Sequence, residues 1–363
     1  MKKFISFLMA VCIALPLFSQ GRGKINIPDL KGYVTLKCDF HMHTVFSDGS
    51  VWPTNRIAEA YLEGLDAISI TDHLEYRPKK DDIVASHNRS YEVALPAAKT
   101  GGIILVRGAE ITRDMPPGHS NAIFITNADE LDKPDYMDAY RAAKAQNAFI
   151  FWNHPGWLSQ QPDTTKWWPE HTKLLEQGMM HGIEVVNGEY YPEVHRWCLE
   201  KKLTMIGNSD THGPMNFAPG KHRTMTLVFA KERTPEALRE ALNERRTAVY
   251  HEEYIIGEEK YLKELFENAL EWNIEKTNKK EEMRVTVTNK SDLTFRLKKT
   301  KSDSRVIYFR NTSIMPFTIA PNSTRTFTVR LLDGIQAGDV NFIVENFLPE
   351  PNKGMKYTIK VRP

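Results

Sequence analysis

The chain has 363 residues, of which 41% are hydrophobic and 10% aromatic, and its formal net charge at pH 7 is +2. These values are typical of an ordered globular protein with room for two domains, and they exclude a largely disordered chain. Without residues 1–20 the chain carries 46 Lys and Arg against 46 Asp and Glu, so its charge does not indicate a nucleic acid duplex as a partner.

Residues 1–20 have the composition of a cleaved secretory signal peptide. Lys2 and Lys3 precede an apolar run from Phe4 to Phe18, and such a run is shorter than a helix that spans a bilayer. We therefore predict a secreted or periplasmic protein, with an N-terminal membrane anchor as the alternative. No later segment is apolar enough to cross a membrane, so we expect no transmembrane segment after removal of the signal.

Of the three cysteines, Cys12 lies within the predicted signal peptide. The other two, Cys38 and Cys198, are far apart in sequence. They could form a disulfide in an oxidising compartment or remain as two buried thiols. Neither belongs to a C-x-x-C pair, so we do not expect a zinc site built on thiolates.

Residues 28–257 are expected to form an α/β barrel. Short apolar strands alternate with helical segments here, a pattern that indicates a mainly parallel sheet or barrel. Pro53 begins one helix and Gly64 follows its end, as helix termini prefer. The expected strands are 34–40, 67–71, 103–107, 122–126, 148–152, 182–186, 204–207 and 225–230. The expected helices are 53–63, 90–99, 134–146, 192–202 and 235–245.

The rest of the chain follows a different pattern. Residues 258–279 are rich in charge and are expected to form a linker helix. Residues 281–363 alternate apolar and polar side chains between turn residues such as Asp333 and Gly334, which predicts a small all-β sandwich domain of about seven strands. This region carries 14 Lys and Arg against eight Asp and Glu, which indicates either a solvated surface or a basic docking face.

Residues of the kinds that bind metals recur where the predicted strands end. In a parallel barrel the side chains at the carboxyl ends of the strands meet on one face. We therefore expect one site that binds several metals through six histidines and three carboxylates. The residues are His41, His43, Asp48, His73, Glu110, His119, His154, Asp210 and His212.

The local context of several of these residues supports a metal site. His41 and His43 are alternate residues of an extended segment and therefore point the same way, and Asp210 and His212 repeat this spacing. Glu110 ends an apolar strand, where a carboxylate would be costly unless it bound metal or was paired. We therefore expect Glu110 to bridge two metals.

Two other acidic residues have alternative interpretations. Asp48 could cap a turn rather than bind metal. Asp72 directly precedes His73, and either residue could bind metal. Asp72 could instead orient a ligating histidine.

The order of these motifs, HxH, D, TDH, E, H, H and DxH, resembles that of the PHP (polymerase and histidinol phosphatase) family over about residues 34–250. The resemblance implies a distorted (β/α)7 barrel of TIM-like type with a trinuclear metal centre. The signal peptide and the C-terminal β-domain lie outside the family's minimal pattern and argue against cytoplasmic roles such as histidine biosynthesis. The implied ligand groups are His41, His43, Glu110 and Asp210; Glu110, His119 and His154; and Asp48, His73 and His212.

Such a centre predicts a metal-dependent phosphoesterase that hydrolyses a small phosphate ester or nucleotide. A hydroxide bridging two metals would attack phosphorus, with Glu110 and Asp210 fixing the metals around it. Metal-bound water, or a pair formed by His73 and Asp72, could protonate the leaving alkoxide. Imidazole and carboxylate ligands suit two or three divalent transition metals, namely Zn, Mn or Fe.

Contacts to the substrate are less constrained by the sequence. Five basic side chains beyond the ligand strands could meet the phosphate or be solvated surface charges, and four tryptophans near His154 could stack on a sugar or base or pack in the core. Hydrolysis of a non-phosphate bond and non-catalytic binding of metal or glycan are the alternative functions. The basic residues are Arg77, Arg113, Lys221, His222 and Arg223, and the tryptophans are Trp152, Trp157, Trp167 and Trp168.

Overall fold

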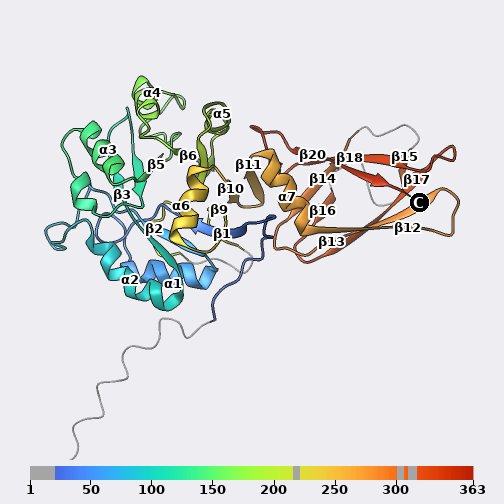
Figure 1. The fold of residues 1–363 in the computed structure, drawn as a ribbon, viewed down its shortest axis with the longest axis horizontal. Coiled ribbons are helices and arrows are strands. Elements are labelled where there is room, and N and C mark those ends of the chain that lie inside the picture. Colours follow the sequence, from blue (N-terminus) through green and yellow to red (C-terminus); the bar gives the residue numbers. More distant parts are fainter. Residues whose placement is uncertain (1–20, 216–220, 301–305, 310–316, 363) are drawn as a thin grey trace, which may run out of the picture.

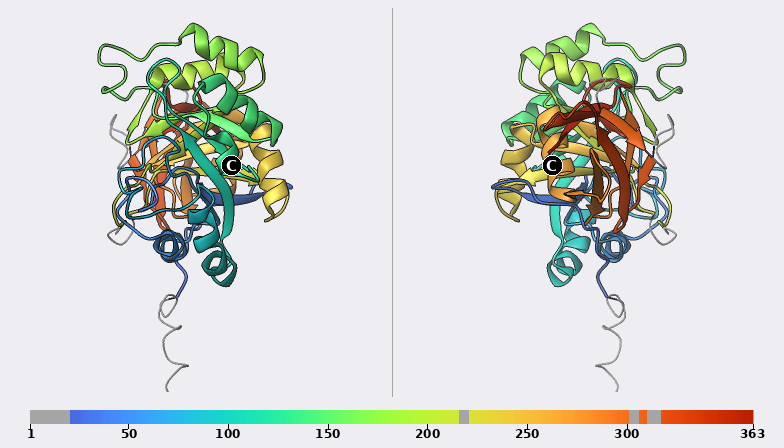
Figure 2. Two further views of the ribbon diagram at one scale, coloured as in Figure 1. Left: turned by 90° about the vertical axis from the view of Figure 1, so that its left-hand side faces the viewer. Right: turned by 90° about the vertical axis from the view of Figure 1, so that its right-hand side faces the viewer.

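The computed structural model describes residues 21–215, 221–300, 306–309 and 317–362, so the predicted signal peptide lies outside the described residues. An α/β domain and an all-β domain lie end to end (Figure 1), and Figure 2 views the molecule from each of these two ends. In the part of the chain that the structure describes, no helix has the length and apolar character needed to span a membrane.

The α/β domain is built on one curled sheet. Its strands pair in the order β11-β10-β9-β1-β2-β3-β4-β5-β6, and both β7 and β8 pair with β6. The strands are β1 (Val34–Asp39), β2 (Ala67–Ile70), β3 (Ile104–Ile111), β4 (Ser120–Ile123), β5 (Phe149–Trp152), β6 (Gly182–Asn187), β7 (Glu189–Tyr190), β8 (Thr204–Asn208), β9 (Met225–Ala230), β10 (Thr247–His251) and β11 (Tyr254–Gly257).

The sheet curls until β8 meets β9 and β10. This closure uses side chains: the Thr226 hydroxyl donates to the Gly207 carbonyl over 2.9 Å, and the Thr247 hydroxyl donates to the Met205 carbonyl over 2.9 Å. Gly207 permits the close approach, because a Cβ there would lie 2.2 Å from Cγ1 of Val249. The predicted barrel is therefore confirmed as a curled, incompletely hydrogen-bonded one.

The expectation of a mainly parallel sheet holds for only part of the barrel. Strands β1, β2 and β3 are parallel, as are β5, β6 and β8, but β4 is antiparallel to both of its neighbours. Parallel neighbours need a crossover of about a dozen residues or more, and the loop 112–119 between β3 and β4 contains no helix. Strands β9, β10 and β11 form an antiparallel ribbon, although a helix connects β9 to β10.

Helices cover the outside of the curled sheet (Figure 1). The first begins with Pro53, and it ends at Gly64, whose φ of +90° lets its amide donate back to the Ala60 and Tyr61 carbonyls. Helix α4 and strands β10 and β11 are additional to the elements that the sequence predicts. The helices are α1 (Pro53–Glu63), α2 (Arg89–Gly101), α3 (Tyr136–Ala145), α4 (Pro169–Glu176), α5 (Pro192–Lys201), α6 (Pro235–Asn243) and α7 (Glu259–Ala269), with a 3-10 turn at Ala128–Leu131.

The predicted linker helix 258–279 is wrong in its second half. Helix α7 ends at Ala269, and β12 (Leu270–Lys276) follows directly. The more buried side chains of β12 recur at every second residue, which is the period of a strand rather than a helix. The β-domain therefore begins about ten residues earlier than the sequence predicts.

The predicted β-sandwich is confirmed, with eight strands among its described residues in place of about seven. One sheet has the order β12-β13-β17-β15 and the other β16-β14-β18-β20. The remaining strands are β13 (Glu282–Asn289), β14 (Phe295–Lys299), β15 (Val306–Phe309), β16 (Phe317–Ile319), β17 (Thr324–Leu331), β18 (Gly338–Val344), β19 (Phe347–Leu348) and β20 (Met355–Val361).

The two domains share backbone pairing and a hydrophobic core. Strand β19 leaves the sandwich and pairs in parallel with β11 of the barrel, with Ile255 opposite Phe347. Phe266 of α7 packs against Phe295 and Phe347, with ring centroids 5.3 and 6.2 Å apart. The carboxamide of buried Asn346 donates to the carbonyl of Glu253 in the barrel. These contacts hold the sandwich against the barrel.

Cys38 and Cys198 are both buried free thiols. They belong to different core clusters of the barrel. The reduced alternative is therefore the one that the structure supports.

Candidate metal centre

The ends of β1 and β8 bring two histidines and an aspartate to one point. Nε2 of His41 and Nε2 of His43 lie 3.1 Å apart, and Oδ1 of Asp210 lies 3.1 Å from each. Oε2 of Glu110, from the end of β3, lies 3.5 and 3.3 Å from the same two nitrogens. Four donors placed tetrahedrally around a metal at about 2.0 Å are about 3.3 Å apart. These four atoms therefore have the spacing of a metal-ligand set.

Glu110 lies between this set and a second group of histidines. Its Oε1 lies 2.9 Å from Nδ1 of His119 and 3.7 Å from Nε2 of His154, while its Oε2 faces His41, His43 and, at 2.9 Å, Nδ1 of His73. Oε2 is fully buried and yet accepts no hydrogen bond of good geometry. A buried acceptor surrounded by imidazole nitrogens fits a carboxylate that is shared between cations.

A third group lies on the open side of His43. Oδ2 of Asp48 is 3.2 Å from Nε2 of His212, and its Oδ1 is 3.6 Å from Nε2 of His73. The His43 ring stacks against those of His73 and His212, with centroids 4.4 and 4.2 Å away. Asp48 thus faces histidines, in place of the turn-capping role that was its alternative.

All nine predicted ligands, called the donor residues below, therefore lie in one cluster. Their assignment to individual metals stays a prediction that follows from the family resemblance. The backbone is strained at two of them, since His154 has a φ of +30° and Asp210 a φ of +51°. Such conformations persist only where the surroundings fix them, and they concentrate at functional sites.

The buried carboxylates of the cluster are compensated by positive charge. Burial lowers the pKa of His73, but the carboxylates of Glu110 and Asp48 raise it to about 10. Burial raises the pKa of Asp48, but hydrogen bonds from His212 and His73 hold it well below its usual range. Buried carboxylates are stable only when paired or bound to metal. The residues present therefore fit divalent cations by their chemistry as well as by their spacing.

Glu184 is a functional residue that the sequence interpretation missed. It is fully buried in β6. Its Oε1 lies 2.9 Å from Nδ1 of His41 and accepts a hydrogen bond from the side-chain carboxamide of Asn208 over 2.9 Å. Its Oε2 accepts from the backbone amide of His154 over 2.7 Å. A glutamate within an apolar strand was a visible signal, since the same feature marks Glu110.

Arg56 connects the segment that contains His41 and His43 to the segment that contains Asp210 and His212. This fully buried guanidinium donates twice to the His43 carbonyl, over 3.0 and 2.9 Å, and once to the Thr211 carbonyl over 3.0 Å. It therefore fixes the segments before Asp48 and His212 relative to each other.

The predicted pairing of Asp72 with His73 is wrong. The Asp72 carboxylate accepts from the Thr44 amide over 2.7 Å and from the Ser47 hydroxyl over 2.8 Å. Nδ1 of His73 instead lies 2.7 Å from the Thr112 hydroxyl. Asp72 holds the loop that carries Asp48 and has no contact that supports the predicted role in protonating the leaving group.

A pocket of about 780 Å³ opens above the donor residues. Six donor residues line it, and the other lining side chains are mostly apolar or uncharged. In the described part of the chain its wall comes entirely from the α/β domain. The non-donor residues that line it are Tyr76, Thr112, Trp157, Leu158, Asn187, Gly188, Glu189 and Tyr191.

None of the five basic residues predicted to contact phosphate lines this pocket. The Arg77 guanidinium donates to the Phe46 and Ala85 carbonyls, and Arg113 pairs with Glu75 at 2.8 Å. Arg223 is buried and pairs with Asp39 and Glu63.

The other two of these residues are also not among those that line the pocket. The His222 ring packs on Tyr250 with centroids 4.2 Å apart, and Lys221 is exposed. The prediction is therefore wrong for the three arginines, because their guanidinium groups are bonded within the fold. Neither Lys221 nor His222 is among the residues that line the pocket.

Of the four tryptophans near His154, only Trp157 lines the pocket. Its ring lies 5.2 Å from that of His154 and 5.7 Å from that of His119. Trp152 is buried and stacks on Trp197 at 6.1 Å. The core-packing alternative therefore applies to Trp152, and the binding alternative stays open for Trp157.

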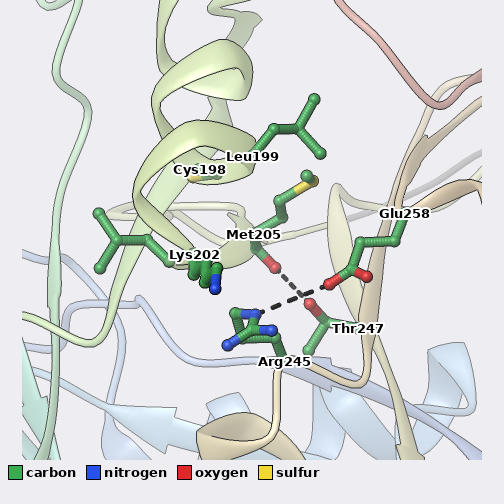
Figure 3. A pocket seen from close by; sticks show the side chains of 8 residues that line it. Cys198, Leu199, Lys202, Met205, Arg245, Thr247 and Glu258 are labelled. Atoms are coloured by element: carbon green, nitrogen blue, oxygen red, sulfur yellow. Dashed lines mark hydrogen bonds and ion pairs between the residues drawn. The ribbon is translucent and has the colours of Figure 1, made fainter.

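A second, smaller cleft of about 240 Å³ lies at the opposite, amino end of β8. Figure 3 shows Arg245 facing Glu258, 3.7 Å away, across this cleft, with Thr247 bonded to the Met205 carbonyl. Cys198 lies in its wall, and none of the metal-ligand groups found among the described residues is there. We therefore place the functional site only at the carboxyl ends of the strands.

Comparison with known families supports both domains. A family model described as an Ig-like domain matches residues 270–360, which begin at β12 and end within β20. The match agrees with the structure in starting the β-domain at residue 270 rather than 281.

Two known proteins are similar to part of the chain or to nearly all of it. The chain is 27% identical over 190 residues to an uncharacterized protein of Methanocaldococcus jannaschii, covering 49% of this chain and 83% of that one. It is 53% identical, with a TM-score of 0.91, to a two-domain protein of Bacteroides vulgatus that contains a predicted PHP-like metal-dependent phosphoesterase; the match covers 94% of this chain and 100% of that one. Identity of this degree across both domains confirms the resemblance seen in the motifs, and the chain belongs to the family of two-domain PHP-like metal-dependent phosphoesterases.

Proposed function

We propose that the protein hydrolyses a phosphate ester in the pocket above the nine donor residues. The observation that carries this proposal is the position of Glu110, whose two oxygens face two different groups of ligands. A carboxylate shared in this way is typical of sites where two metals clamp a phosphoryl group. The relative from Bacteroides vulgatus is described as containing a predicted metal-dependent phosphoesterase, which supports the proposal.

Three ligand groups would hold two or three divalent ions. Their mixed nitrogen and oxygen donors suit Zn, Mn or Fe. When bound, such ions acidify water and neutralise the oxygens of a phosphoryl group. The groups that the family resemblance implies are His41, His43, Glu110 and Asp210; Glu110, His119 and His154; and Asp48, His73 and His212. By distance alone, the ligand atoms also group as His41, Glu110 and His154, and as His73, Glu110 and His119.

Residues behind the ligands fix which imidazole nitrogen faces the centre. Nδ1 of His41 donates to Glu184, which leaves the Nε2 lone pair directed at Asp210 and Glu110. Nδ1 of His212 donates to the Asp210 carbonyl over 2.8 Å, which leaves Nε2 facing Asp48. Partners of this kind set the tautomer and raise the basicity of a ligating histidine.

Hydrolysis of an uncharged ester or lactone is the second candidate. In the described part of the chain neither Lys nor Arg lines the pocket, so the protein itself offers no cation to a phosphate. Bound metals would supply that charge for a phosphate ester, whereas a neutral substrate would not need it.

One panel of substrates tests both candidates. The mature chain, loaded in turn with Zn, Mn or Fe, is incubated with phosphate monoesters, phosphate diesters, carboxylic esters and lactones. Release of the alcohol from a phosphate ester, lost on chelation, is the expected result. Turnover of only the uncharged esters or lactones would contradict phosphate-ester hydrolysis and support the second candidate. Turnover of neither class would contradict both candidates.

Export from the cytoplasm also belongs to the proposal, since it rests on the sequence of residues 1–20 alone. The small phosphorylated substrate would then be met outside the cytoplasm. Detection of the mature N-terminus near residue 21 in the periplasmic or extracellular fraction is the expected result, and recovery of the whole chain with the membranes would favour the anchor.

A further inference from the structure

The pocket is much larger than a phosphate group. Its volume is about 780 Å³, within the range of about 300–1,000 Å³ that ligand pockets use for whole organic molecules. The donor residues occupy its floor. The remaining wall must therefore contact the alcohol portion of a substrate whose phosphate reaches the donor residues.

Two aromatic side chains stand on that wall beside the donor histidines. The Tyr76 ring lies 5.8 Å from the His73 ring, and the Trp157 ring lies 5.7 Å from the His119 ring. His73 and His119 are themselves ring neighbours at 5.7 Å. Tyr76 and Trp157 therefore flank one continuous row of rings above the cluster.

Both aromatic side chains are unusually exposed for their size. Tyr76 is 55% exposed and Trp157 44%, and the adjacent Leu158 is 68% exposed. Large apolar side chains exposed together at a pocket mark a surface that is covered when a ligand binds. Flat aromatic faces of this kind stack on flat unsaturated rings, whatever the ring's hydrogen-bonding pattern.

The charge of the pocket wall limits the kind of group that can bind there. Glu189 is the one charged non-donor residue among those that line the pocket in the described part of the chain. A second anionic group on the substrate would find no basic partner there and would meet this carboxylate. The wall therefore suits a group without negative charge of its own.

From these observations, and resting on the proposed phosphoester hydrolysis, we propose that Trp157 and Tyr76 bind a flat unsaturated ring in the alcohol portion of the substrate. The two residues would then determine specificity, while the donor residues carry the chemistry. An aryl group and a nucleobase share this ring chemistry, and separate substrates distinguish them.

The test compares substrates with and without a flat ring in each variant. The value of kcat/KM is measured for 4-nitrophenyl phosphate, for adenosine 5′-monophosphate and for glycerol 3-phosphate, and the ratio of ring to ringless substrate is formed. This ratio is insensitive to any loss of folded or metal-loaded enzyme, because both substrates see the same preparation. A larger fall of the ratio for one ring substrate in the pocket variants identifies the aryl or the nucleoside class, because the intrinsic reactivity of each substrate is the same in every variant.

We expect Trp157→Ala and Tyr76→Ala each to lower this ratio at least about fivefold, mainly through KM, since stacking of one ring contributes about 1–3 kcal/mol. Trp157→Phe should retain most of the ratio. Trp272→Ala, a matched change on half-buried β12 in the other domain, should leave it unchanged. An unchanged ratio in both pocket variants, or a wild-type preference for glycerol 3-phosphate, would overturn the inference.

A binding measurement separates this inference from the proposed function. If the wild type cleaves none of the three esters, the proposed hydrolysis is contradicted for these substrates. Calorimetric titration of the metal-loaded protein with the same compounds then tests whether the pocket binds a flat ring. Tighter binding of 4-nitrophenyl phosphate than of glycerol 3-phosphate, lost in Trp157→Ala, would still support the ring site. Equal affinities would overturn it.

Discussion

Nε2 of His41 and Nε2 of His43 lie 3.1 Å apart, and both rings are fully buried. Two imidazole lone pairs at this distance repel each other unless a proton or a cation lies between them. Asp210 adds a carboxylate oxygen 3.1 Å from each nitrogen. The arrangement of His41, His43 and Asp210 beyond the carboxyl end of β1 is therefore stable only when a positive charge lies among these side chains.

Removal of the metals should lower the melting temperature of the protein. An ion that binds only the folded state, at about a thousandfold excess over its Kd, stabilises that state by about 4 kcal/mol. For a chain of this size we expect chelation to lower Tm on the order of 8 °C. Elemental analysis and calorimetry before and after chelation check this. An unchanged Tm, in a protein that takes up no Zn, Mn or Fe, would contradict the metal centre.

Glu110→Ala should abolish activity while leaving the fold intact. The side chain faces two ligand groups at once, so its loss disturbs both. We expect kcat/KM to fall by more than about 100-fold, which exceeds the usual effect of residues that only support ligands. Glu236→Ala on the exposed first turn of α6 is the control. Wild-type turnover by the Glu110 variant, with unchanged metal content, would sink the proposed role.

Glu184→Gln should weaken metal binding without removing a ligand. The substitution keeps the size of the side chain but removes the charge that holds Nδ1 of His41 at 2.9 Å. Loss of such a partner typically costs about 10–100-fold in metal affinity. Competition with a chromophoric chelator measures the affinity, and a Kd within twofold of the wild type would contradict this role.

Gly49→Ala should release the metal held by Asp48, His73 and His212 and leave the others bound. A Cβ at Gly49 would lie 2.6 Å from the carbonyl carbon of His43, so the loop that carries Asp48 must move. Gly213→Ala is the matched control, because an added Cβ there meets nothing within 4 Å. Metal stoichiometry should fall by about one ion per chain in the first variant alone. Equal stoichiometry in both would exclude a separate ion at Asp48.

The nine donor residues could be predicted from sequence because they lie at or after the carboxyl ends of five strands, β1, β2, β3, β5 and β8. These strands run in the same direction, and parallel strands bring their ends together. Roles that depend on distant partners could not. Asp72 is held by Thr44 and Ser47 from another loop, and Arg223 by Asp39 and Glu63 from β1 and α1. No local pattern distinguishes an arginine that holds a loop from one that binds phosphate.

The domain boundary was missed for a local reason. The length and charge of segment 258–279 favour one continuous helix. The change from a helical to an alternating hydrophobic period near residue 270 is too short a signal to outweigh them. The pairing of β19 with β11 could not be anticipated either, because a two-residue strand carries almost no periodic signal.

His171 supports the loop before His119. Its ring is fully buried, its Nε2 donates to the Pro117 carbonyl over 2.7 Å, and its Nδ1 accepts from the Trp168 amide over 3.1 Å. These two bonds require the neutral imidazole. Burial lowers the pKa of His171 from 6.5 to about 4.

Because the folded-state pKa lies below the unfolded value, the neutral form of His171 contributes stability fully above pH 6.5, and this contribution is lost as pH falls toward 4. Between pH 7 and pH 5 we expect the metal-free protein to lose roughly 2 kcal/mol through this group. His171→Gln removes the titration, while His195, whose pKa burial also lowers to about 4, titrates in both proteins and cancels in the comparison. Urea unfolding at the two pH values measures the difference, and equal losses in wild type and variant would show that His171 is not held neutral.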